Sequence, residues 1–340
     1  MITERFAAQL LTGPPAASPE EVTGRLLAVQ AQDPRGARLA IRPRSAGLTA
    51  ADVDQALTGG TLLITWLNRG TLHLVRGEDY WWLHALTTPP LRAGVARRLA
   101  QEGVTPDAAG RAVAVIEKSL TDEGPLTRPQ LRDRIAAAGI RTEGQALVHE
   151  LVLASLSQVA VRGPMAGREH AYVLVRDWLG APPELDRDVA LAELARRFLA
   201  GHGPADDRDL AKWAGVPLRD ARAGLAAIAR ELVQRPDGLA GLAALAGQRD
   251  HGVPPPRLLG SFDPLLHGWV SREPILGAHQ GIVTVNGLFR PFALVGGRAV
   301  ATWGLAGGDV SLDRLAELPD AAEGALAAEA DEVRRYLGLT

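Results

Sequence analysis

Cysteine is absent from the 340 residues of this chain. The absence excludes disulfides and metal sites built from thiolates, and it fits a protein of the reducing cytoplasm. Aromatic residues make up only 4%, so leucine, valine and alanine must fill the core. Lysine occurs only at Lys118 and Lys212, which makes nearly all of the 37 basic residues arginines. Arginine suits phosphate recognition, but the codon bias of a GC-rich genome explains most of this content.

Long apolar runs are also missing. No window of ~18 uncharged apolar residues is present, and the first five residues begin no signal segment, so we expect a cytoplasmic protein that does not cross a membrane. The eight histidines lack metal-ligand spacing, and neither a phosphate-binding loop nor a nucleophile elbow occurs. We therefore expect no metal and no cofactor. The net charge is −2, so binding to nucleic acid would require a locally basic face.

Residues 1–105 predict helices and one strand region. Ser18-Pro19-Glu20-Glu21 combines an N-cap, a first-turn proline and acidic residues, and the apolar spacing after it predicts a helix that ends near Gln30. The strand region covers residues 62–75, and its second half alternates between apolar and polar residues. Arg69, Thr71 and His73 fall on the polar face, which could line a cleft. For His73, a site role and a place beside the core are equally favoured.

Two later segments share an order of elements. Residues 106–180 predict three helices and a hairpin, which is the order of a winged helix. Residues 181–253 predict the same helices, the third of them over 218–233. The turns after the first helices match as Gly-Pro-x-[Thr/Asp]-x-x-x-Leu at a spacing of 79 residues, with Thr127 and Asp206 as helix caps. This match predicts a structural repeat.

The last segment, residues 254–340, predicts a small antiparallel sheet and a capping helix. A run of three prolines precedes it as a linker. Asn286-Gly287 lies between alternating apolar runs and predicts a hairpin over 282–295. Gly296-Gly297 predicts a second turn, and the helix is expected over 321–337.

The stretch Gln30-Ala31-Gln32-Asp33 is unusually polar for the end of an apolar helix. On a continuous helix the two glutamines would point ~200° apart, but a helix that ends before Asp33 allows them to converge. Their amides could instead cap the helix by bonding its free carbonyls. Arginines follow at once, and they form either a solvated basic loop or phosphate contacts: Arg35, Arg38, Arg42 and Arg44.

Several motifs together resemble one family. They are Gln30-Ala31-Gln32, the strand from Trp66 to Val75, His202-Gly203-Pro204 with Trp213, and Phe262-Asp263-Pro264-Leu265-Leu266. In this order, over nearly the whole chain, they resemble the AlkZ/YcaQ family of bacterial DNA glycosylases, and Gln32 is typical of the AlkZ-like branch. The resemblance implies an α+β fold, mainly α, in which three tandem winged helices form a C shape around DNA and a small antiparallel sheet follows. The first winged helix would then lie within residues 1–105.

The resemblance implies a monofunctional glycosylase that hydrolyses the N-glycosidic bond of N7-alkylated purines, including bulky or crosslinked adducts, for repair or self-resistance. Such a base already carries a positive charge and leaves without a general acid, so Gln30 and Gln32 would hold a water and face the cationic sugar. Asp33 is a stronger base and an alternative for activating the water. Arg35, Arg38, Arg69, Thr71 and His73 would bind DNA or line the cleft. We expect a nucleoid-associated monomer acting on double-stranded DNA; the alternatives are a non-catalytic winged-helix regulator and a scaffold without affinity for nucleic acid.

Overall fold

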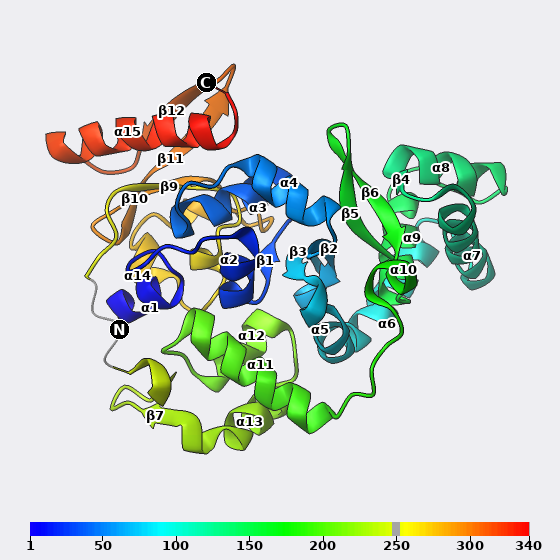
Figure 1. The fold of residues 1–340 in the computed structure, drawn as a ribbon, viewed down its shortest axis with the longest axis horizontal. Coiled ribbons are helices and arrows are strands. Elements are labelled where there is room, and N and C mark those ends of the chain that lie inside the picture. Colours follow the sequence, from blue (N-terminus) through cyan, green and yellow to red (C-terminus); the bar gives the residue numbers. More distant parts are fainter. Residues whose placement is uncertain (247–251, 340) are drawn as a thin grey trace. The chain divides into compact units, whose positions relative to one another are not determined.

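The computed structural model describes residues 1–246 and 252–339. The chain forms two compact units, which are described separately: the first joins residues 1–53 to residues 187–340, and the second contains residues 54–186 (Figure 1). Helices account for 52% of the residues and strands for 19%, which confirms the predicted mainly α, α+β class. The predicted four-segment division follows motifs along the chain and stays a prediction. No helix in the described ranges is long and apolar enough to cross a membrane.

The first unit begins with short helices around the glutamine stretch. Its first elements are α1 (Ile2–Ala8), α2 (Pro19–Leu26), β1 (Val29–Gln30) and α3 (Pro34–Ile41). Ser18 caps α2 through the amide of Glu21, as predicted, but the predicted end near Gln30 is wrong. The helix stops at Leu26, Leu27 takes a φ of 66°, and Gln30 lies in a short strand. Residues 26–29 are all buried, and a continuous apolar run does not distinguish helix from strand by its spacing.

The middle of the first unit is a winged helix. Its elements are α11 (Arg187–His202), α12 (Asp207–Ala214), α13 (Leu218–Ala227), β7 (Leu232–Gln234) and β8 (Ala240–Leu242). Asp206 forms the predicted cap, in a capping box with Asp209. The third helix is shorter than the predicted 218–233, because residues 232–234 pair with residues 240–242 as a hairpin. Backbone pairing of Val233 with Gly241 thus replaces the helical bonds expected there.

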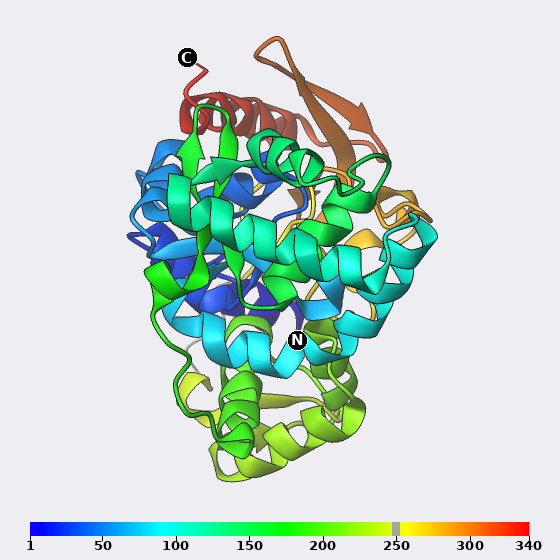
Figure 2. The same cartoon turned by 90° about the vertical axis from the view of Figure 1, so that its right-hand side faces the viewer.

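The C-terminal part of the first unit is a sheet covered by a helix. The elements are β9 (Arg257–Leu259), α14 (Glu273–Leu276), β10 (Phe292–Val295), β11 (Arg298–Ala306), β12 (Asp309–Arg314) and α15 (Asp320–Tyr336). The four strands are antiparallel in the order β12-β11-β10-β9. Helix α15 lies beside the β11–β12 hairpin in both views (Figures 1 and 2). Leu258, Trp303, Leu326 and Tyr336 belong to the core that joins the sheet and the helix.

Of the two turns predicted in this sheet, only one connects two strands. Gly296-Gly297 joins β10 to β11 as expected. The hairpin over 282–295 is wrong, because Asn286-Gly287 closes a loop with one bridge, between Val283 and Phe289. The second half of that stretch instead inserts between β9 and β11, where Phe292 is completely buried. Burial of this strand in the sheet outweighs the local hairpin signal.

The second unit contains another winged helix and the strand pair of the polar face. Helix α4 (Ala50–Thr58) crosses the boundary between the units. The remaining elements are β2 (Leu62–Leu67), β3 (Thr71–Arg76), α5 (Tyr80–Thr87), α6 (Arg92–Gln101), α7 (Pro106–Glu123), β4 (Leu126–Thr127), α8 (Arg128–Ala137), α9 (Ala146–Leu156), β5 (Ala160–Ala166), β6 (Glu169–Leu174) and α10 (Val175–Leu179). The strands lie side by side in the order β3-β2-β5-β6-β4. Helices α7, α8 and α9 followed by the β5–β6 hairpin confirm the predicted order, including the capping box at Thr127.

The predicted polar face breaks at Arg69. Residues 62–76 form two antiparallel strands rather than one, and Asn68–Gly70 is the tight turn between them. Arg69 has a φ of 53° in this turn, so it does not belong to the alternation of Thr71 and His73 on β3. The left-handed conformations of Arg69 and Gly70 close the turn, and alternation along the sequence does not reveal such a reversal.

Candidate active site

The glutamine stretch leaves the core at the end of a sharp chain reversal. The side chain of Gln30 is 7% exposed, Ala31 is buried and Gln32 is exposed. Among the described residues, neither glutamine amide has a hydrogen-bond partner in the protein, and neither is sealed from solvent. Polar groups this deeply placed are normally bonded. The interpretation of these amides as helix caps is therefore wrong.

The backbone conformation also changes the geometry of the pair. Gln30 is the last residue of the two-residue strand β1, and Gln32 follows outside any helix or strand. The separation of ~200° expected on a helix does not apply. Ala31, between the two glutamines, is buried on the core side.

Asp33 is the N-cap of α3. Its Oδ1 accepts a hydrogen bond from the amide of Arg35 at 2.9 Å, and Pro34 occupies the first helical position. Its other oxygen, Oδ2, has no hydrogen-bond donor within residues 1–246 and 252–339. One carboxylate oxygen therefore holds the helix, and the other is available to a water.

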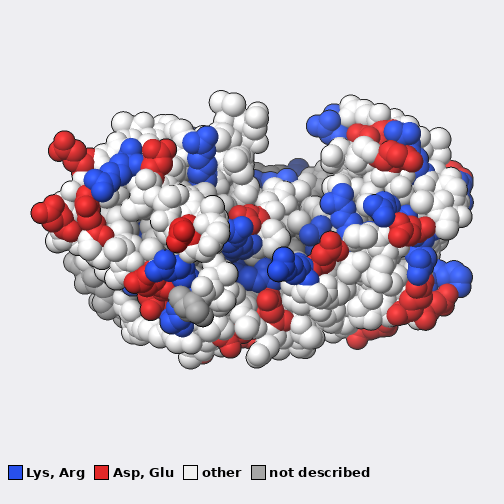
Figure 3. Space-filling view, turned by 90° about the horizontal axis from the view of Figure 1, so that it is seen from above, with Lys and Arg blue, Asp and Glu red and all other residues white. Residues whose placement is uncertain are grey.

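The two predicted arginines on α3 differ in environment. Arg35 is exposed, and its guanidinium makes no ion pair with any described residue. Arg38 is buried and its Nη1 donates to the carbonyl of Pro34 at 2.7 Å. Arg35 is thus placed to contact a ligand, whereas Arg38 braces the first turn of the helix. On the face drawn in Figure 3, basic and acidic side chains are interspersed.

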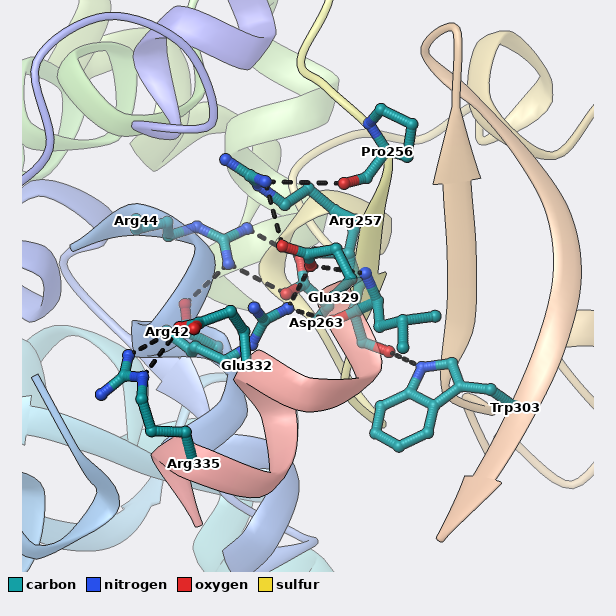
Figure 4. A network of polar contacts seen from close by, with 12 residues as sticks. Arg42, Arg44, Pro256, Arg257, Asp263, Trp303, Glu329, Glu332 and Arg335 are labelled. Carbon is teal, nitrogen blue, oxygen red and sulfur yellow. Dashed lines mark hydrogen bonds and ion pairs between the residues drawn. The ribbon is translucent and has the colours of Figure 1, made fainter. Parts of the chain in front are cut away.

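Arg44 is not a phosphate contact. Its guanidinium donates to both carboxylate oxygens of Asp263, at 2.9 and 2.7 Å, and both side chains are 0% exposed (Figure 4). Arg42, the other arginine of the predicted cluster, pairs with Glu329 at 2.6 Å. Spacing in the sequence placed these residues in a basic loop, but the chain folds them inward because buried carboxylates from distant segments compensate their charge.

A buried chain of hydrogen bonds runs from this ion pair to the end of α2. Arg44 Nη2 donates to Gln9 Oε1 at 3.0 Å, and Gln9 Nε2 donates to His202 Nδ1 at 3.0 Å. His202 Nε2 in turn donates to the carbonyl of Leu26 at 3.2 Å. Burial lowers the pKa of His202 to about 3, so the ring is neutral and can accept at one nitrogen while it donates at the other. The network fixes the last residue of α2, just before the reversal that leads to Gln30.

Two glycines let neighbouring segments approach this region closely. A Cβ on Gly201 of α11 would lie 2.3 Å from the carbonyl oxygen of Arg25, and one on Gly36 of α3 would lie 2.4 Å from that of Ser261. Both distances are far shorter than any real contact, so only glycine fits there. Of the network residues, Gln9, Asp263 and His202 were not predicted as site residues, and Arg44 was predicted only as part of a basic loop or as a phosphate contact. The Phe-Asp-Pro and His-Gly-Pro motifs contained two of them and were the available signal.

In the second unit, Thr71 and His73 form a local pair on β3. His73 Nδ1 donates to the carbonyl of Thr71 at 2.9 Å. Burial lowers the pKa of His73 to about 3, and the nearby positive charge of Arg69 contributes. His73 is therefore neutral and leaves Nε2 as an acceptor, which excludes it as a cationic contact to phosphate. Arg69 itself is exposed on the turn.

The structure thus gathers the predicted site residues into two groups. The first unit holds Gln30, Gln32, Asp33 and Arg35 together at the junction of β1 and α3. The second unit holds Thr71 and His73 on one strand, with Arg69 in the adjoining turn. All residues of each group lie within one unit.

Comparison with known proteins gives a family. The sequence model of the family described as "DNA glycosylase AlkZ-like" matches residues 23–336. A curated protein of Streptomyces sahachiroi, "Interstrand DNA cross-link repair glycosylase", is 27% identical over 334 residues, which cover 88% of this chain and 85% of that protein. The solved structure of Streptomyces sahachiroi DNA glycosylase AlkZ shares the fold, with a TM-score of 0.78 at 24% identity over 99% of this chain and 96% of that one. Since the family model spans most of its length, the chain belongs to the AlkZ-like family of DNA glycosylases.

Proposed function

We propose that this DNA glycosylase hydrolyses the N-glycosidic bond of N7-alkylated purines in double-stranded DNA, bulky adducts and interstrand crosslinks included. The observation that carries the proposal is the pair of unbonded amides at Gln30 and Gln32. The Streptomyces relative is an interstrand cross-link repair glycosylase, which supports crosslinks as one substrate. We further propose a monomer that acts in the cytoplasm at the nucleoid, without a cofactor.

The chemistry suits amides better than ionisable groups. Alkylation at N7 makes the purine a cationic leaving group, so the bond breaks without a general acid and the sugar develops positive charge. A glutamine carbonyl has its negative end available to a water and to this sugar, and it needs no pKa adjustment. Gln30 and Gln32 meet the requirement because no protein donor occupies either oxygen among the described residues.

Asp33 has a supporting role in this proposal. Its Oδ1 holds the first turn of α3 and thereby the backbone that carries both glutamines. Its Oδ2 remains an alternative acceptor for the proton of the water. Arg35 at the same helix start is the proposed contact to a DNA phosphate. Arg69, Thr71 and His73 of the second unit are proposed to contact DNA, His73 through a neutral ring.

The test is base release from duplexes that carry N7-methylguanine, a bulky N7 adduct or an N7 interstrand crosslink. We expect Gln30→Ala and Gln32→Ala each to slow release on the order of 10²-fold, the scale of removing one group that stabilises transition-state charge. Gln55→Ala is the matched control, because Gln55 is an exposed glutamine on α4. Asp33→Asn separates the roles of the carboxylate, since it retains the capping oxygen and removes the base.

The proposal fails if the wild-type protein releases none of the three bases above the spontaneous rate. The winged-helix order also fits a second candidate, a DNA-binding regulator without catalysis. A regulator would bind a particular duplex sequence with equal affinity after both glutamines are replaced by alanine. Binding and base release measured on the same variants therefore distinguish the two functions.

A further inference from the structure

Three arginines from separate segments surround one pocket in the first unit. The pocket has a volume of about 260 Å³, and Arg42, Arg257 and Arg335 line it together with Glu329 and Glu332. Arg42 follows α3, Arg257 begins β9 and Arg335 lies near the end of α15. Figure 4 shows Glu329 between the guanidinium groups of Arg42 and Arg257, and Glu332 beside the guanidinium group of Arg335.

The guanidinium groups have unused hydrogen-bonding capacity. Arg42 is only 8% exposed, and of its three nitrogens only Nη2 is bonded, to the Leu258 carbonyl at 2.8 Å and to Glu329 at 2.6 Å. Arg257 likewise donates only through Nη1, to Glu329 at 3.0 Å and to the Pro256 carbonyl at 3.5 Å. The Nε atoms of both are buried without a partner among the described residues. Arg42 Nη1 and Arg257 Nη2 are bonded to no described residue but remain accessible.

The carboxylates of the pocket are already engaged. Glu329 accepts from Arg42, from Arg257 and from the backbone amide of Leu258 at 3.1 Å. Glu332 is bonded to Arg335 at 2.8 Å. Three guanidinium groups therefore face two carboxylates, and the lining keeps one excess positive charge. Glu329 compensates the buried charge of Arg42, so the excess charge lies with Arg257 and Arg335, which are 28% and 43% exposed where they line the pocket.

We propose that this pocket binds a phosphate group. The guanidinium fork matches phosphate oxygens in geometry and charge, and phosphate accepts more hydrogen bonds than a carboxylate. Because the three arginines come from three segments fixed by the sheet and α15, the donors are positioned before the ligand arrives. Gly47 also lines the pocket.

The phosphate has two possible sources, a DNA backbone or a free phosphate compound. The DNA source rests on the proposed function, whereas the site itself does not. Both sources share the same chemistry at the arginines. They differ in how binding responds to salt, because each DNA phosphate that a protein contacts adds about 0.9 to the slope of log affinity against log salt.

Arg335→Gln is the variant of choice. Its side chain is 43% exposed, so the change removes one donor without opening the core, and Arg257→Gln repeats the test from β9. Arg334→Gln is the matched control, since it is the adjacent residue on α15, pairs with Asp331 and lies outside the pocket. Calorimetry at low salt measures the affinity for inorganic phosphate, and a salt titration measures binding to an undamaged duplex.

We expect wild type and Arg334→Gln to bind inorganic phosphate equally and Arg335→Gln to bind it about tenfold more weakly, the scale of one charge-assisted hydrogen bond. If the duplex salt slope also falls by about 1 in Arg335→Gln alone, the phosphate belongs to DNA. If only phosphate affinity falls, the ligand is a free phosphate compound. A wild type that binds no phosphate and shares its salt slope with Arg335→Gln overturns the proposal. None of these measurements uses base release, so a failure of the phosphate site can be distinguished from a failure of the proposed glycosylase function.

Discussion

Removing one partner of the ion pair between Arg44 and Asp263 should strongly destabilise the first unit. Both side chains are completely buried, and Asp263 accepts two bonds from Arg44 and one from the amide of Leu265 at 2.9 Å. Asp263→Asn keeps the shape but removes the negative charge, which leaves the guanidinium buried and uncompensated. Breaking a buried pair from one side costs about 3–5 kcal/mol. We expect a loss of that size in the free energy of unfolding.

Urea unfolding at neutral pH, followed by circular dichroism, measures the loss. Glu323→Gln is the control, because it breaks an ion pair of similar length, 2.7 Å to Arg314, whose side chains are 39% and 56% exposed. Exposed pairs contribute about 0–1 kcal/mol, so the control should stay close to wild type. Both variants neutralise a carboxylate that pairs with an arginine, and the two sites differ in burial and in the number of hydrogen bonds that the carboxylate accepts.

The same substitution should slow base release in protein that is still folded. Arg44 holds Gln9, Gln9 bonds to His202, and His202 bonds to the carbonyl of Leu26, so the perturbation reaches the reversal that carries Gln30. The assay is single-turnover release well below the unfolding temperature of the variant. An Asp263→Asn protein as stable as Glu323→Gln would refute the reasoning, since the buried charge of Arg44 would then have another compensation.

Three further predictions rest on single positions. Glu150 is completely buried, neither of its carboxylate oxygens is bonded among the described residues, and burial raises its pKa from 4.5 to about 7. Wild type should therefore lose up to ~3 kcal/mol of unfolding free energy as the pH rises through that interval, whereas Glu150→Gln should not, and equal pH profiles of the two proteins in urea unfolding would contradict this. Gly201→Ala should lower the unfolding temperature, because the added Cβ meets the carbonyl oxygen of Arg25. Gly110→Ala should raise it slightly, because Gly110 is an exposed position of helix α7 with nothing within 4 Å of an added Cβ. The rings of His73 and His202 should stay neutral at pH 5, since burial lowers each pKa to about 3, and an NMR titration midpoint above 5 in either would contradict their burial.

Local signals predicted the starts of helices well. Ser18, Thr127 and Asp206 each cap a helix as expected, because a cap depends on a few neighbouring residues that the sequence displays directly. The Gly296-Gly297 turn was confirmed for the same reason, since its conformation requires the residues that occupy it. The order of elements of a winged helix could be predicted because these helix starts and turns mark where each element begins.

Ends of elements and the partners of charged residues were not predictable in this way. The helix expected to reach Gln30 stops at Leu26, and Leu27 to Val29 are buried although they are not helical. Arg44 was expected at the surface, and its partner Asp263 is 219 residues away. No local pattern contains that pairing, so a buried ion pair and an exposed phosphate contact look alike in the sequence.

The glutamine stretch differs from other segments with unbonded polar side chains in that its unbonded amides are accessible to solvent. Asn68 and Glu150 also carry side-chain atoms without a partner among the described residues, but these atoms are sealed from solvent. A sealed group bears its desolvation cost and has no route to a substrate. The amides of Gln30 and Gln32 lack partners and remain accessible, so water or a sugar can complete their hydrogen bonds. The hydrogen-bond network of Gln9, Arg44 and His202 ends at Leu26, four residues before Gln30, so a fully bonded segment leads directly into two open amides, as the proposed hydrolysis requires.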